Sequence, residues 1–156
     1  MELSKSSRHS KITGDFAESL VLYWLSKYGF ECAAIDHTGI DLIARNPKNN
    51  ELLGISVKSR SRNTGKETTY VSIKNDNFEK AASACKAFGC IPYFAIVVDA
   101  GEKISAFILS MAELEKITIK GETTHSLKMT PKYIDQYRNN PNIIIFEFTH
   151  QTHRWF

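Results

Sequence analysis

The sequence predicts a single α/β domain, residues 1–156, with a central mixed β-sheet flanked by helices. Three observations predict this class. A length of 156 residues fits one domain with a proper core. An amphipathic segment at 14–28 precedes several short β-rich runs, and the strongly apolar run YFAIVVD at 93–99 suits a buried strand. Helical and extended segments therefore alternate along the chain, as they do in α/β domains.

Residues 14–28, GDFAESLVLYWLSKY, are predicted to form the first helix. Thr13 is available as its N-cap, Asp15 suits the positive end of the helix dipole, and Gly29 provides a stop. At about 100° per residue the helix has one broad apolar face, formed by Phe16, Ala17, Leu20, Val21, Trp24, Leu25 and Tyr28. Glu18 falls at the edge of this face, so we expect its carboxylate to be half-buried.

The remaining elements follow in the order expected of one domain, without repeats or linkers. Extended segments are predicted at 30–35, 41–45, 52–59 and 68–73, then a second helix at 76–88, and further extended segments at 93–99 and 103–110. The last part is predicted to hold a short helix at 111–116, another helix opened by Thr130-Pro131, and a final strand at 142–148.

The composition is that of an ordinary soluble globular protein, with 42% apolar and 24% charged residues. No apolar run approaches the roughly 18 residues that span a bilayer, and the N-terminal segment leads into no hydrophobic stretch of the kind found in secretory signals. The three cysteines form no CxxC pair and fit small core residues in a reducing compartment. We therefore expect a cytoplasmic protein with no membrane partner.

Basic residues cluster in two places, although the net charge of +3 is mild. The segment SVKSRSRNTGK contains Lys58, Arg60, Arg62 and Lys66 without an acid, and the basic N-terminal segment includes Lys11. Both clusters can be ordinary solvated charge. If the chain binds nucleic acid, Arg60, Arg62, Lys66 and Lys11 are the candidates for phosphate contacts.

Two apolar runs at 39–62, GIDLIARNPKNNELLGISVKSRSR, carry charged residues on matching faces. If RNPKNNE forms a hairpin turn, its midpoint places Asp41 opposite Ser56, with Lys58 diagonally beside Asp41. A slip of one residue would break the match of the apolar faces, which supports this register. Asp41, Ser56 and Lys58 are therefore predicted to converge on one patch.

An aspartate beside a lysine on adjacent strands has two interpretations. One is an ion pair on the sheet surface with a purely structural role. The other is a Mg²⁺ (or Mn²⁺) site, because these cations take one or two carboxylates plus waters and phosphate oxygens. A nearby lysine can orient or deprotonate the attacking water and offset charge that develops on phosphate.

The same residues resemble the PD-(D/E)xK nuclease superfamily. The motif runs G-x-x-A-E on the first helix (Gly14, Ala17, Glu18), G-I-D at the start of a strand, and an apolar strand ending in x-V-K. Within the superfamily, the arrangement looks most like small Holliday-junction-resolvase-like and Mrr-like endonucleases. The string GIDLIARNP…GISVKSRSR is also similar to uncharacterised small bacterial proteins placed near them. The resemblance covers roughly residues 12–110, which leaves 111–156 as a C-terminal extension.

The resemblance implies a restriction-endonuclease-like fold with an αβββαβ core, and Mg²⁺-dependent hydrolysis of DNA phosphodiesters. By position, Asp41 matches the first metal-binding acid, Lys58 the catalytic lysine, and Glu18 the helix acid that completes or supports the metal site. The backbone carbonyl of Val57 falls where superfamily members commonly offer a metal ligand. Because resolvase-like relatives are often dimers, a homodimer is a further expectation.

Ser56 departs from the superfamily pattern, which usually has Glu or Asp at this position. A serine hydroxyl is a neutral and weaker Mg²⁺ ligand. Three explanations stay open: Glu18 supplies the second carboxylate, the metal is recruited only together with DNA phosphate, or the site is degenerate. The sequence therefore predicts a Mg²⁺-dependent DNA endonuclease with Ser56 in its catalytic patch. The alternative is an inactive module that binds DNA or acts as a scaffold, and a purely structural α/β module is a third interpretation.

Overall fold

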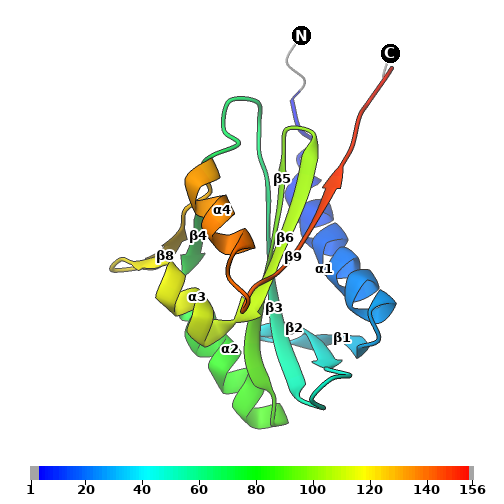
Figure 1. Ribbon diagram of the computed structural model, residues 1–156, viewed down its shortest axis with the longest axis vertical. Coiled ribbons are helices and arrows are strands. Elements are labelled where there is room, and N and C mark those ends of the chain that lie inside the picture. The colour runs from blue at the N-terminus through cyan, green and yellow to red at the C-terminus, as the bar shows by residue number, and fades with distance from the viewer. Residues whose placement is uncertain (1–3, 155–156) are drawn as a thin grey trace.

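A six-stranded mixed sheet forms the centre of the structure, a computed structural model that describes residues 4–154 (Figure 1). In spatial order, its strands are β1 (Glu31–His37), β2 (Ile40–Arg45), β3 (Leu52–Ser61), β5 (Ile91–Ala100), β6 (Lys103–Ser110) and β9 (Ile144–Thr149). Neighbouring strands are antiparallel, except that β3 and β5 are parallel. The predicted α/β class with a central mixed sheet is confirmed.

The two faces of this sheet are covered by different elements (Figure 1). The helix α1 (His9–Lys27) lies against one face. On the other side lie α2 (Asn75–Phe88), α3 (Met111–Ile117), α4 (Pro131–Arg138) and a small sheet of β4 (Val71–Lys74), β8 (Thr124–Leu127) and β7 (Ile119–Lys120). Between α1 and α2, the chain contributes only β1, β2 and β3 to the central sheet, which agrees with the expected αβββαβ core.

Side chains that alternate along the central strands supply a separate apolar cluster on each face. On the α1 side, Ala17 and Val21 pack with Leu42 and Ile55. On the α2 side, the cluster is built around aromatic and branched residues, including Phe78, Phe94, Ile96, Phe107 and Leu114. The strand β5 serves both clusters, because it is apolar on both faces, as its continuous apolar run predicted.

The helix α1 begins earlier than predicted. It starts at His9, and Thr13 lies inside it with its hydroxyl donating to the carbonyl of His9 at 2.7 Å. The prediction that Thr13 is the N-cap is therefore wrong; Arg8 holds that position. The reason is that residues 9–13 contain no helix breaker but also show too little apolar periodicity to mark them as helical.

Two aromatic residues assigned to the buried face of α1 are exposed: Phe16 is 45% and Tyr28 56% accessible. Phe16 lies five residues before Val21, which turns it about 140° away from the centre of the packed face. Tyr28 is the C-cap, where the chain leaves the helix. Burial on α1 is instead centred on Ala17, Val21 and Leu25.

The extended segment predicted at 68–73 contains a shorter strand, β4, which begins at Val71 and pairs with β8 in the small sheet. The strands β7 and β8 were not predicted, because each has at most four residues and little alternation. No helix within residues 4–154 is long and apolar enough to cross a membrane.

Candidate active site

The hairpin joining β2 and β3 has the register predicted from the sequence. The paired residues are Leu42 and Ile55, Ile43 and Gly54, Ala44 and Leu53, and Arg45 and Leu52. The amide of Asn46 closes the turn by donating to the carbonyl of Glu51 at 2.8 Å. The backbone pairing ends at Leu42 and Ile55, and next to it the side chain of Asp41 meets β3 at the amide of Val57.

The carboxylate of Asp41 is held by the backbone of β3. The amide of Val57 donates to Asp41 Oδ2 at 2.7 Å, so a side chain takes the place of a backbone acceptor where β2 begins. In an extended strand, the N–H and C=O of one residue point to the same side. The carbonyl of Val57 therefore also points toward the side of β3 on which Asp41 lies.

Glu18 reaches the same place from α1. Its position follows from the packing of Ala17 and Val21 against the sheet, which leaves Glu18 half-buried at the edge of the contact, as predicted. Glu18 and Asp41 are close enough for the two carboxyl groups to affect each other's protonation. Burial, and then the negative charges of Asp41 and Asp15, raise the pKa of the Glu18 carboxyl above its ordinary value.

Lys58 completes the group from β3. Its side chain is half-buried, and its Nζ donates to Asn77 Oδ1 on α2 at 3.5 Å. Burial lowers the pKa of Lys58, while the nearby carboxylates of Asp41 and Glu18 act in the opposite direction. The structure thus brings Asp41, Glu18 and Lys58 within electrostatic contact of one another.

Ser56 precedes Lys58 by two residues on β3 and is buried. It is only 2% exposed and pairs with Phe94 of the parallel strand β5. Strand alternation gives Ser56 and Lys58 the same side of β3. A carboxylate at this position would therefore be nearly fully buried.

The candidate phosphate-binding residues have different surroundings. Arg60 donates to the carbonyls of Ser59 and Ser72 at 2.7 and 2.6 Å, and burial and then the charge of Arg62 lower the pKa of its guanidinium. Arg62 donates to the carbonyl of Tyr70 at 2.9 Å. Both arginines therefore tie the end of β3 to the backbone before and within β4, in addition to any other role.

The two candidate lysines are exposed. Lys66 lies in the loop that follows β3. Lys11 forms an ion pair with Asp15 at 3.1 Å, one turn along α1, and both side chains are well exposed. An exposed pair of this kind contributes little to stability, so Lys11 can exchange its partner at small cost.

Asn77 is a member of the group that the sequence did not reveal. It lies in the first turn of α2, and its contact with Lys58 depends on how α2 packs over β3. An asparagine at the start of a helix is common, so no sequence signal distinguishes it.

The donor set at this patch consists of oxygens: two carboxylates, the Val57 carbonyl and the Ser56 hydroxyl. Among residues 4–154, no group of three or more His, Cys, Asp or Glu side chains is arranged to hold a metal ion. Oxygen donors suit Mg²⁺ and Mn²⁺. A divalent cation would also offset the repulsion between Asp41 and Glu18. The residues therefore fit such a cation, with one carboxylate fewer than the superfamily pattern has.

Comparison with known proteins shows a likeness of fold. No protein-family model and no curated protein matches the chain. Among solved structures, the fold is similar to that of Hjc, a Holliday junction resolvase from the archaeal hyperthermophile Archaeoglobus fulgidus. The TM-score is 0.57 at 18% sequence identity, and the match covers 79% of this chain and 88% of that chain. This likeness shows a shared fold, in agreement with the architecture that the sequence resemblance implied.

Proposed function

We propose that this chain is a divalent-metal-dependent endonuclease that hydrolyses DNA phosphodiesters. The observation that supports the proposal is that Asp41, Glu18 and Lys58, from three different elements, are close enough for their charges to act on one another. Two carboxylates that repel each other beside a lysine of lowered pKa lower the stability of the fold, and such groups are concentrated at functional sites. The fold shared with a Holliday junction resolvase supports the choice of DNA as substrate.

In this proposal, three oxygen groups hold the cation: the carboxylates of Asp41 and Glu18 and the carbonyl of Val57. Asp41 is oriented by the amide of Val57, the carbonyl of Val57 points to the same side, and Glu18 approaches from α1. Glu18 then supplies the charge that Ser56 lacks, while the Ser56 hydroxyl is a neutral donor nearby. When bound, Mg²⁺ or Mn²⁺ would polarise the phosphate and lower the pKa of the attacking water.

Lys58 acts on the attacking water and on the phosphate. Burial lowers the pKa of its amine, so a larger fraction is neutral near physiological pH than for an exposed lysine. A neutral amine accepts a proton from water, whereas a charged amine offsets negative charge that develops on the phosphate. The amide oxygen of Asn77 lies 3.5 Å from Nζ and can orient it in either role.

DNA binding rests on the basic residues around this group. Lys66 and Lys11 are exposed, and we propose that they contact backbone phosphates together with Arg60 and Arg62. Nothing among these residues resembles a base-reading element, so recognition of DNA shape is proposed. Because the cutting of both strands of a duplex is served by two active sites, we further propose a homodimer. We propose that it acts in the cytoplasm.

A second candidate is a DNA-binding module that does not cut. It is favoured by one observation: Ser56 is neutral and nearly fully buried where the superfamily has a carboxylate. A panel of linear, nicked and branched DNA, incubated with Mg²⁺ or Mn²⁺, separates the candidates. Cleavage of any member supports the endonuclease, and salt-sensitive binding without cleavage supports the inactive module.

A further inference from the structure

A polar hollow lies where α1 begins, beside the end of β3. Its volume is about 510 Å³. It is lined by polar residues only, none of them acidic, and these include Lys5, His9, Ser10, Thr13, Ser59 and Arg60. A hollow with cations and hydroxyl donors but no carboxylate has the chemistry of an oxyanion site.

The positive charge in this hollow has no acidic partner among residues 4–154. Lys5 donates to the carbonyl of Ser61 at 2.6 Å, and Arg60 donates to the carbonyls of Ser59 and Ser72. His9 Nε2 lies 3.0 Å from Ser61 Oγ. These partners are neutral, so the hydrogen bonds fix the side chains without cancelling the charge of either cation.

The start of α1 adds to the positive potential. The N-cap Arg8 makes no side-chain capping hydrogen bond, and no acidic residue stands in the first turn of this 19-residue helix. Uncapped N–H groups at a helix N-terminus attract anions. Here the start of α1 reinforces a hollow in which Lys5 supplies a side-chain cation, while Arg60 lines the hollow but directs its guanidinium to the carbonyl of Ser72 on β4.

The hollow continues directly from the candidate active site. Ser59 and Arg60 follow Lys58 on β3, and Thr13 and His9 precede Glu18 on α1. At 1.5 Å per residue, these α1 positions lie about 7–14 Å from Glu18 along the helix. Phosphates on one DNA strand advance about 3.4 Å along the duplex axis. For a duplex whose axis runs along α1, this spacing corresponds to roughly two to four nucleotides.

We propose that this hollow binds a backbone phosphate of the DNA substrate, roughly two to four nucleotides from the phosphodiester held at Asp41 and Lys58. The inference rests on the proposed function for its ligand, but not on cleavage. It assigns a binding role to Lys5, Ser10 and the start of α1, which lie outside the candidate active site.

The test is DNA binding in EDTA, so that cleavage plays no part. Lys5→Gln removes a cation from the hollow, and Ser10→Asp places a carboxylate in it. Each change should weaken binding about 3- to 10-fold near 0.1 M salt, and Lys5→Gln should lower the slope of log affinity against log salt by about 0.9. Ser10→Asp should at the same time raise thermal stability, because an acid in the first turn complements the helix dipole. A residue that acts only in folding would change DNA affinity and thermal stability in the same direction, whereas Ser10→Asp should weaken binding and raise stability.

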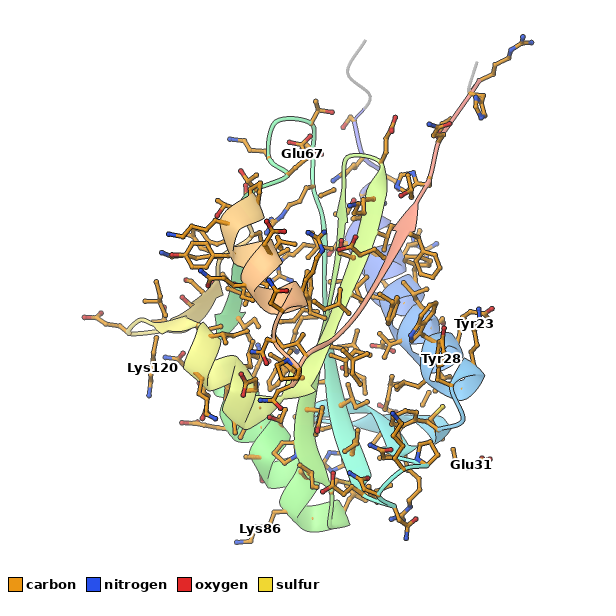
Figure 2. All side chains as sticks on the ribbon, viewed as in Figure 1. Tyr23, Tyr28, Glu31, Glu67, Lys86 and Lys120 are labelled. Atoms are coloured by element: carbon orange, nitrogen blue, oxygen red, sulfur yellow. The ribbon has the colours of Figure 1, made fainter. Side chains whose placement is uncertain are left out.

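Two exposed positions on α2 serve as matched controls. Lys86→Gln removes the same charge at the far end of the molecule from the start of α1, and Ser83→Asp adds the same carboxylate (Figure 2). Both should leave DNA affinity and its salt slope unchanged. Circular dichroism checks that all four variants are folded.

A duplex series with one neutral methylphosphonate at each position locates the contact. At one position, the methylphosphonate should weaken DNA binding by the wild-type protein, but it should not weaken binding by Lys5→Gln any further.

If the wild-type protein binds DNA while both hollow variants keep its affinity and slope, the hollow is not a phosphate site, and the proposed function stands. If the wild-type protein binds no DNA, both proposals fail. Stabilisation by inorganic phosphate that is lost in Ser10→Asp, without an effect on DNA, would assign the hollow to a free anion and overturn the DNA contact.

Discussion

The backbone amide of Val57 donates a hydrogen bond to the carboxylate of Asp41 across 2.7 Å. This bond joins the start of β2 to the middle of β3 through a side chain. It fixes one oxygen of the carboxylate and leaves the other free to bind elsewhere. The carbonyl of Val57 points to the same side of β3 as its amide. In the proposed metal site, Val57 would therefore both orient the Asp41 carboxylate and offer its own carbonyl oxygen as a ligand.

Lys58→Ala should lower the rate of metal-dependent DNA cleavage by roughly 10²–10⁴-fold, the usual contribution of a positioned acid–base group. Affinity for duplex DNA should change much less. Lys58→Arg tells the two possible roles apart, because arginine keeps the charge but does not release its proton. Cleavage rates and affinities of the three proteins provide the measurement.

If Lys58 accepts a proton, Lys58→Arg should lose as much rate as Lys58→Ala. Retention of most of the rate in Lys58→Arg would assign the residue to charge stabilisation. Equal losses of binding and rate in Lys58→Ala would make Lys58 a simple phosphate contact and contradict the catalytic role.

Ser56→Glu should tighten metal binding, seen as a lower Mg²⁺ concentration for half-maximal cleavage. Without metal it should lower the free energy of unfolding, because the new carboxylate is placed at a site only 2% exposed and close to Asp41. Ser56→Ala should matter little if Glu18 and the Val57 carbonyl hold the cation. Titration of Mg²⁺ against cleavage and thermal stability compares the three proteins. An unchanged metal affinity in Ser56→Glu, with activity abolished in Ser56→Ala, would instead make the hydroxyl a specific ligand.

Glu18 should make stability depend on pH in a defined direction. A carboxyl with a raised pKa binds more protons in the folded than in the unfolded state, so the free energy of unfolding falls as pH rises from about its ordinary value of 4.5 through the raised pKa. Glu18→Gln should remove this fall and be more stable than the wild-type protein above that window. Thermal melts across pH in EDTA measure this effect, with the exposed Glu31→Gln as control.

The same melts with added Mg²⁺ test the ligand role of Glu18. The wild-type protein should gain stability, because the cation binds the folded state and offsets the repulsion between the two carboxylates. Glu18→Gln should gain less. Parallel pH profiles for the wild-type protein and Glu18→Gln would show that the carboxyl is not perturbed as described.

Gly39 should be needed for the placement of Asp41, two residues later. It has φ +104, and a Cβ on this residue would collide with the backbone carbonyl of Lys80 on α2. Gly39→Ala should therefore lower the free energy of unfolding by at least about 1 kcal/mol. Denaturant unfolding measures the change. Gly14→Ala is the matched control, since its site is open and helical, and should stabilise the protein by about 0.5–1 kcal/mol.

The sequence predicted those parts of the site that depend on strand pairing. Alternation of apolar residues and the hairpin midpoint together determine the β2–β3 register, which the structure shows from the pair of Leu42 and Ile55 to the pair of Arg45 and Leu52. The half-buried position of Glu18 likewise follows from helical periodicity. Local patterns are sufficient for these features, because each depends on a single element or one hairpin.

Features that depend on packing between distant elements could not be predicted. The contact of Lys58 with Asn77 requires the position of α2, and the pairing of β4 with β8 joins segments far apart in the chain. The bonds of Arg60 to backbone carbonyls are another case, since a basic run in a sequence looks the same whether it is solvated or not.

The most direct test of the central claim is cleavage of branched and linear DNA by the wild-type protein and Asp41→Asn, with Mg²⁺ or Mn²⁺ titrated from zero. Asparagine keeps an oxygen for the Val57 amide but loses the charge that binds a cation. Asp36→Asn, an exposed acid on β1, is the matched control. The proposal predicts metal-dependent cleavage by the wild-type protein and Asp36→Asn, and none by Asp41→Asn at any metal concentration. Equal cleavage by Asp41→Asn, or no cleavage by the wild-type protein on any substrate with either metal, would contradict it.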